Sequence, residues 1–206
     1  MTVLLTAFTT LFVIIDPIGL TPLFVALTAG ASAAQRRAIA LRSCLTAAII
    51  LFIFAIFGEA LLGFVGISMS AFRIAGGVLL FLTALEMLFQ KRQTRRKSQA
   101  DDAELDHVDD PSVFPIAIPL IAGPGAIASM ILLTDQMPGL IGFASVIGVM
   151  LSVLAIVFAL FLASHWLERA LGRVGVNVVT RLLGMLLAAL AIQFILDGLR
   201  TSGFGG

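Results

Sequence analysis

Two long apolar stretches of this chain are interrupted near their middle by prolines at the same spacing. The first holds Pro17 and Pro22 in IIDPIGLTPLF, and the second holds Pro119 and Pro124 in IPLIAGPGAIAS. Proline removes a backbone donor and clashes with the preceding turn, so a helix kinks or breaks there. In hydrocarbon, such a break is tolerated only where the freed backbone groups face protein or a water-filled cavity. The two stretches therefore predict interrupted membrane helices.

The composition requires a membrane. Of 206 residues, 60% are apolar and 12% are charged, whereas a soluble domain carries about twice that charged fraction. Six runs approach or exceed the ~20 residues that cross the hydrocarbon as a helix. We predict an all-α membrane protein with broken helices one and four, whose six transmembrane helices lie at 2–28, 43–65, 70–90, 112–135, 140–164 and 180–200.

A long polar segment, 91–111, divides the chain into two groups of three helices, 1–90 and 112–206. The segment is basic first and acidic second, and we interpret it as a solvated linker. Its basic half would lie near anionic lipid headgroups. His107 lies there without metal-ligand spacing, so we expect neither a metal nor another cofactor.

The two groups resemble one another. The third predicted helix reads RIAGGVLLFLTALEML from Arg73, and the sixth reads RLLGMLLAALAIQFIL from Arg181, with Gly76 aligned to Gly184. Because each group has an odd number of helices, the second copy enters the membrane from the opposite face. The pattern predicts two inverted-topology three-helix repeats, a known construction of secondary transporters.

The basic residues predict the orientation. Eleven of the thirteen Lys and Arg residues fall in the predicted loops after helices one, three and five. The excess of Lys and Arg marks cytoplasmic loops, which places both termini outside.

Asp16 is the most specific polar residue of the first interruption. Asp followed by Pro17 is typical of a helix N-cap and first helical position. An ionisable residue inside a membrane span is also a functional candidate, because its burial is expensive. Asp16 either caps the second half of the helix only, or also faces a cavity and binds a cation, a substrate ammonium group or a proton.

The second interruption has no comparable side chain. Gly123 precedes Pro124, so the amides of Gly125 and Ala126 would be left bare at a helix N-terminus, where anions bind. The alternative is close backbone packing of small residues, as in Gly125-x3-Ser129. Asp16 and these amides, meeting from opposite sides, would suit a small zwitterion.

Other polar residues have weaker patterns. Thr10, Thr21, Thr83 and Ser129 could bind freed carbonyls or substrate. Glu86 and Gln193 could line the pathway, although Glu86 could instead reach the interface. Hydration at the outer surface explains Glu59 and Asp197.

The motifs DPIGLTPLF and PLIAGPGAI, with the RIxGG start of the third helix, resemble the MarC family over essentially the whole chain. The resemblance implies a prokaryotic inner-membrane protein related to LysE-type exporters. It also implies transport of small neutral amino acids such as glycine and alanine, with coupling to a cation such as H⁺ or Na⁺. The residues that it places around a central site are Asp16, Pro17, Gly19, Pro22, Pro119, Gly123, Pro124 and Gly125.

Other functions are less well matched. An enzyme would need a metal cluster or a nucleophile with its base, and the two histidines, single cysteine and scattered serines form no such constellation. A drug exporter and a non-transporting membrane protein stay open. We expect no nucleic-acid partner, and Ala144-x3-Gly148 suits internal packing or a homo-oligomer equally.

Overall fold

The computed structural model describes residues 2–92, 94–96, 98 and 110–203, and these residues form helices joined by short turns, without a strand. The predicted all-α class is confirmed. The helices are α1 (Thr2–Ile15), α2 (Pro17–Leu27), α3 (Ala33–Val65), α4 (Met69–Leu88), the π-helix η1 (Ser112–Ile121), α6 (Pro124–Gln136), α7 (Gly139–Leu162) and α8 (Ser164–Thr201).

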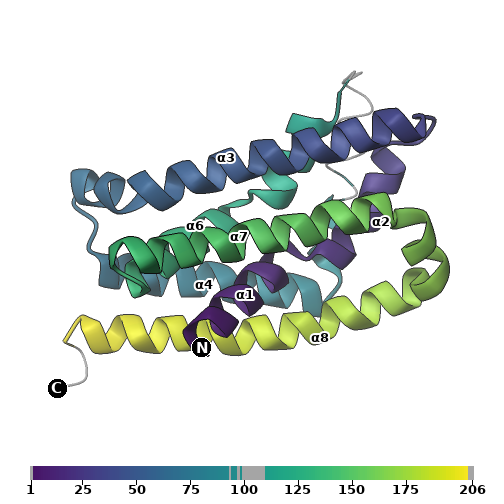
Figure 1. The fold of residues 1–206 in the computed structure, drawn as a ribbon. Helices are drawn as coiled ribbons and strands as arrows, with labels where there is room; N and C mark the ends of the chain where they lie inside the picture. The colour runs from purple at the N-terminus through teal and green to yellow at the C-terminus, as the bar shows by residue number, and fades with distance from the viewer. Residues whose placement is uncertain (1, 93, 97, 99–109, 204–206) are drawn as a thin grey trace.

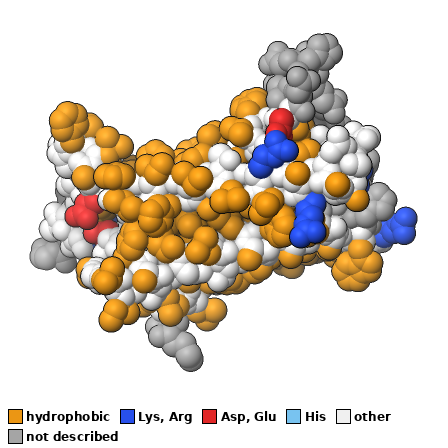
Figure 2. Space-filling model, turned by 45° about the horizontal axis from the view of Figure 1, so that its top comes forward, with side chains coloured by type: hydrophobic (Ala, Val, Ile, Leu, Met, Phe, Trp, Pro, Cys, Tyr) orange, Lys and Arg blue, Asp and Glu red, His pale blue; other side chains and the backbone are white. Residues whose placement is uncertain are grey.

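Five helical segments of the described chain are long and apolar enough to cross a membrane, and a sixth is obtained when η1 and α6 count as one bent span. The five are Val3–Leu27, Ala33–Val65, Met69–Leu88, Gly139–Leu162 and Val174–Thr201. Apolar side chains are spread over the whole face in Figure 2, and its few charged side chains lie at the left end and in the right-hand half. This surface suits a multi-pass membrane protein.

The spans run side by side in a bundle (Figure 1). We call the end that carries the 28–32 turn and the linker the linker side, and the end that carries the 66–68 turn the far side. They lie at the right and left of Figure 1, respectively.

Two helices, α3 and α8, begin ten or more residues earlier than predicted. Ser32 and Gln35 form a capping box that starts α3 at Ala33, so Arg36 and Arg42 lie on a helix and not in a loop. The capping box satisfies two backbone donors at once, which explains the early start. α8 begins at Ser164 and is interrupted by Gly172, at φ 58° and ψ 179°.

The interrupted spans form the interior of the bundle. In the most apolar part of Val3–Leu27, 56% of the residues are buried, against 22–33% in the other four spans. Phe24 of α2 stacks on Phe161 of α7 with the ring centroids 4.2 Å apart. Most of α6 from Gly125 to Leu133 is also buried.

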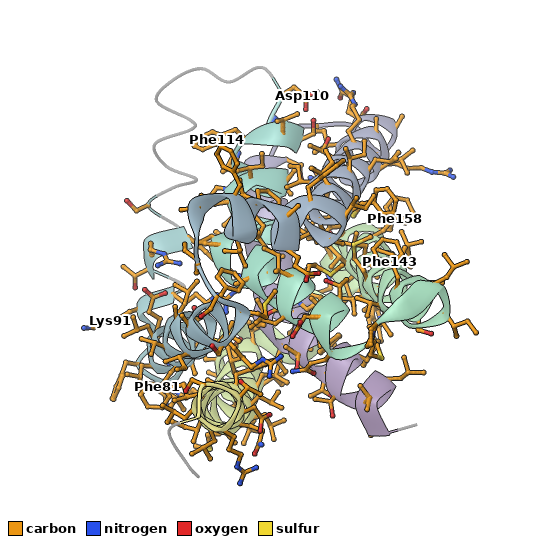
Figure 3. The ribbon with its side chains drawn as sticks, turned by 90° about the vertical axis from the view of Figure 1, so that its left-hand side faces the viewer. Phe81, Lys91, Asp110, Phe114, Phe143 and Phe158 are labelled. Carbon is orange, nitrogen blue, oxygen red and sulfur yellow. The ribbon has the colours of Figure 1, made fainter. Side chains whose placement is uncertain are left out.

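α4 packs along α8 through glycines. A Cβ atom at Gly77 would lie 2.8 Å from the Ala191 carbonyl oxygen, and one at Gly198 would lie 3.0 Å from the Ser70 carbonyl oxygen. A side chain at either position would push the helices apart, which explains the small residues. Figure 3 views the bundle from the far side, with α4 and α8 adjacent.

The linker is only partly solvated. Residues 91–92, 94–96 and 98 are helical. Lys91 points away from the bundle (Figure 3), but Arg92 and Arg96 are only 6% and 2% exposed. The prediction of a solvated linker is therefore wrong for these two arginines. His107 and the rest of 99–109 lie outside the described residues.

Candidate functional site

The first interruption is a single residue. α1 ends at Ile15, Asp16 adopts a left-handed conformation (φ 57°, ψ 64°), and α2 begins at Pro17. Asp tolerates this conformation better than most residues, and Pro is preorganised for the first position of a helix. The Asp16 carboxylate accepts a hydrogen bond from the Gly19 amide at 3.1 Å. Asp16 is therefore the N-cap of α2.

The same carboxylate forms a buried ion pair. An Nη1–Oδ2 distance of 3.0 Å joins Arg96 to Asp16, and the two side chains are 3% and 0% exposed. Two charges buried this deeply require one another, because removal of either leaves an uncompensated charge.

The last carbonyl groups of α1 also accept hydrogen bonds from arginines. Arg96 donates to the Ile15 carbonyl oxygen at 3.1 Å, and Arg92 donates to the Ile14 carbonyl oxygen. The end of a helix leaves carbonyls without an intrahelical partner and favours positive charge. The linker arginines thus satisfy the α1 end of the interruption, and Asp16 satisfies the α2 end.

The second interruption is sharper. η1 and α6 meet at an angle of 56°. Phe114 and Ile118, inside η1, have extended backbones with φ of −124° and −123°. Each directly precedes a proline, whose ring disfavours helical conformation in the residue before it.

The N-terminus of α6 carries no capping side chain. Its N-cap is Gly123, at φ −80° and ψ 170°, and no side chain of the described residues caps the helix by a hydrogen bond. A Cβ atom at Gly123 would lie 2.6 Å from the Pro119 carbonyl oxygen. The close turn therefore requires glycine, and the absence of a capping side chain leaves the first amides of α6 available to an anion.

A cavity of about 440 Å³ lies at this second interruption. Its described lining comes from four places: the end of α1, the second half of α4, the arginines of the linker, and the adjoining ends of η1 and α6. The lining residues are Ile14, Leu79, Leu82, Thr83, Glu86, Arg92, Arg95, Arg96, Pro119, Leu120, Ile121, Gly123, Pro124, Gly125 and Ala126.

The cavity has positive and negative groups. Arg92, Arg95 and Arg96 contribute guanidinium groups, and the α6 N-terminus adds the positive end of a helix dipole. Glu86 pairs with Arg95 at 2.7 Å through Oε1. Its Oε2 atom is buried and has no hydrogen-bond partner among the described residues.

The structure brings together only part of the predicted site. Seven predicted residues line the cavity: Thr83, Glu86, Pro119, Gly123, Pro124, Gly125 and Ala126. Eight do not: Thr10, Asp16, Pro17, Gly19, Thr21, Pro22, Ser129 and Gln193. Of the two interpretations of Asp16, the structure supports the cap, since its carboxylate faces Arg96 and not the cavity.

Thr10 lies outside the cavity, and its buried Oγ1 atom has no hydrogen-bond partner among the described residues. The other predicted polar side chains outside the cavity have partners of their own. Thr21 donates to the Pro17 carbonyl oxygen and Ser129 to the Gly125 carbonyl oxygen, each at 2.9 Å. Gln193 donates to Asp197 at 2.9 Å on the exposed face of α8. Thr83 also donates within its own helix, to the Leu79 carbonyl oxygen, although it lines the cavity.

The three linker arginines were missed by the sequence analysis. Arg92 and Arg96 are four residues apart, the spacing that places side chains on one face of a helix. That spacing within a basic segment was an available signal. It does not say whether the face meets solvent or protein.

The linker joins the second half of the chain at another ion pair. Arg42 of α3 donates to Asp110, and the Asp110 carboxylate also accepts from the Ser112 amide at 3.0 Å. Burial acts to raise the pKa of Asp110, but the hydrogen bonds from Ser112 and the Arg42 charge hold it below its usual range. Among the described residues, no group of three His, Cys, Asp or Glu side chains could hold a metal ion.

Known proteins resemble the chain over nearly its whole length. The sequence profile of the MarC family integral membrane protein matches residues 1–202. A UPF0056 membrane protein of Archaeoglobus fulgidus is 39% identical, with 94% of this chain and 90% of that protein covered. The UPF0056 membrane protein YhcE of Escherichia coli is 37% identical, with 92% and 88% covered. No solved structure matches the chain.

Proposed function

The chain belongs to the MarC family of integral membrane proteins, and from that premise we propose that it is a secondary transporter of small neutral amino acids. The cavity beside the α6 N-terminus is the observation that carries the proposal, because charged groups of both signs border it. We place it in the inner membrane, with the linker side cytoplasmic, both termini outside, and transport coupled to a cation gradient.

The arrangement of the spans supports transport. Interruptions occur in the first span, at Asp16, and in the bent span formed by η1 and α6. These are corresponding positions in the two halves, as expected for inverted repeats whose broken helices surround a substrate. α4 and α8, the third spans of the two halves, lie against each other.

The substrate pose follows from the charges. The bare amides of α6 and the Arg92 guanidinium would bind the carboxylate of an amino acid. The unpartnered Oε2 atom of Glu86 would accept a hydrogen bond from its ammonium group. Glu86 thus takes the role that the sequence suggested for Asp16, because both carboxylate oxygens of Asp16 already accept hydrogen bonds.

The size and lining of the cavity favour a small solute. Its volume of about 440 Å³ lies toward the lower end of the ~300–1,000 Å³ typical of ligand pockets. Among its described lining residues none is aromatic. Aromatic rings are the usual partners of large organic cations, so the lining favours an amino acid over a drug-like cation.

Transport by purified protein in liposomes tests the proposal. We expect labelled glycine or alanine to cross the membrane, faster with an imposed proton or sodium gradient than without one. Liposomes without protein give the background. Failure of every amino acid in a full panel, with and without gradients, would refute amino acid transport and favour a non-transporting membrane protein.

The Glu86→Gln variant tests the pose. A hydrogen bond to a charged group contributes about 1.5–3 kcal/mol, so we expect KM for alanine to rise about tenfold or more. Glu59→Gln, an exposed carboxylate near the far side of α3, is the matched control and should leave KM unchanged. Equal KM values for both variants would remove Glu86 from the pose.

A further inference from the structure

The contact between α4 and α6 changes along its length. On the far side the two helices touch, and toward the linker side they diverge around the cavity. The residues of this contact, which we call the α4–α6 interface, are Arg73, Gly76 and Leu80 of α4, and Gly125, Ala128, Leu132 and Asp135 of α6.

The α4–α6 interface is antiparallel. Arg73 pairs with Asp135 at the far end. One turn deeper, a Cβ atom at Gly76 would lie 2.9 Å from Leu132 and 4.0 Å from Ala128. Deeper still, a Cβ atom at Gly125 would lie 3.6 Å from Leu80. The two helices are therefore in direct contact at each of these positions.

The cavity begins where this interface ends. Thr83 follows Leu80 on α4 by three residues, so it lies on the same face of the helix, and Glu86 follows Thr83 by another three. Both line the cavity, together with Gly125 at the start of α6. A solute in the cavity is therefore separated from the far side by the α4–α6 interface.

The ion pair at the far end is less completely satisfied than the one at Asp16. The Arg73 and Asp135 side chains are 14% and 22% exposed, whereas both groups of the Asp16–Arg96 pair are almost fully buried. The Nε atom of Arg73 is buried without a hydrogen-bond partner among the described residues. A pair that keeps contact with solvent and leaves one donor unused is easier to separate and re-form.

We propose that the α4–α6 interface is the far-side gate of the transport path, and that the Arg73–Asp135 pair holds this gate closed. The inference rests on the proposed transport function. Opening requires α4 and α6 to separate from their far ends inward, and Gly76 allows them to close again at short range. The Asp16–Arg96 pair stays intact during this movement.

Accessibility of a cavity residue from the far side tests the gate without any substrate. Cys44 is the only cysteine in the sequence, so Cys44→Ala with Thr83→Cys carries one thiol, in the cavity. A membrane-impermeant maleimide is applied to vesicles of either orientation. With the Arg73–Asp135 pair intact, labelling from the far side should be slow.

Asp135→Asn should then accelerate far-side labelling about fivefold or more, because loss of an ion pair shifts a two-state equilibrium by such a factor. The charge reversal Arg73→Asp with Asp135→Arg should restore slow labelling. Asp197→Asn is the matched control, since Asp197 pairs with Arg200 at an exposed helix end, and it should change nothing.

A second variant guards against misfolding of the first. Leu132→Ala removes the side chain that faces Gly76 without altering charge, and it should also accelerate far-side labelling. If Asp135→Asn and Leu132→Ala both label at the rate of the Asp197→Asn control, the gate is refuted. Accelerated labelling in a protein that transports no amino acid would keep the gate and refute only the proposed substrate.

Discussion

The two proline-containing interruptions share one spacing but differ in how their backbone groups are satisfied. At the first, a carboxylate caps α2 and two arginines bind the last carbonyls of α1, all of them buried. At the second, Gly123 provides no side chain, the helices bend by 56°, and a cavity adjoins the amides of α6.

The cap residue accounts for this difference. Asp16 brings a negative charge into the protein, and that charge recruits Arg96. Once the arginine is bound, both oxygens of the Asp16 carboxylate have hydrogen-bond donors within the protein. Gly123 has no charge to attract an ionic partner, so the positive end of α6 stays uncapped among the described residues. The same proline spacing thus occurs at an interruption filled by charged side chains in one half, and at an uncapped helix start beside a cavity in the other.

Loss of Arg96 should have the largest effect on the first interruption. In Arg96→Met, the Asp16 carboxylate stays buried without its partner, so we expect the free energy of unfolding to fall by about 3–5 kcal/mol. Thermal unfolding of the purified protein in detergent measures this change.

The double variant Asp16→Asn with Arg96→Met sharpens the result. Because Asn keeps a capping oxygen without charge, we expect the double variant to unfold at a higher temperature than Arg96→Met alone. A double variant that is no more stable than Arg96→Met would mean that the buried charge is not the cause.

Matched glycine substitutions should have an intermediate effect. A Cβ atom at Gly19 would overlap the Asp16 carboxylate, so Gly19→Ala should destabilise the protein by about 1–3 kcal/mol. A Cβ atom at Gly125 would lie 3.4 Å from Ile14 and 3.6 Å from Leu80. These are ordinary contacts, so Gly125→Ala should change stability by less than about 1 kcal/mol. Equal losses, measured by thermal unfolding, would contradict the contrast between a filled and an open interruption.

The exposed ion pair of the linker should have the smallest effect. Arg42 and Asp110 are 59% and 38% exposed, and surface pairs contribute about 0–1 kcal/mol. The pKa of Asp110 is held below its usual range. The stabilisation is therefore present at neutral pH and lost as the pH falls through the pKa of the folded protein. Arg42→Gln should weaken this pH dependence, measured by thermal unfolding across pH, because only the Ser112 hydrogen bond then lowers the pKa of Asp110. It should not lower stability as Arg96→Met does.

The fold class was accessible from sequence because it depends on composition. Long apolar runs must form helices that satisfy their own backbone in lipid. Helix starts were less accessible. Arg36 suggested a polar loop, but the capping box of Ser32 and Gln35 carries α3 through that region. Helices can extend past the hydrocarbon, and hydropathy does not detect the extension.

Only part of the candidate site could be predicted from the sequence. Gly123 and Gly125 were found because a helix start without a side-chain cap is a local feature. Asp16 was assigned to the same site because its partner is 80 residues away in the chain. No local pattern shows that a linker arginine enters the bundle to neutralise it.

Residue order alone thus specified a membrane bundle and the positions at which its helices are interrupted, since both follow from hydrophobicity and from the missing donor of proline. The packing of distant segments specified which interruption is open. The burial of Arg92 and Arg96 against α1, and the divergence of α4 from α6 around the cavity, are long-range contacts. Charge compensation acts through space. Whether a buried carboxylate is neutralised within the protein therefore depends on which distant residue packs beside it, as Arg96 does at Asp16.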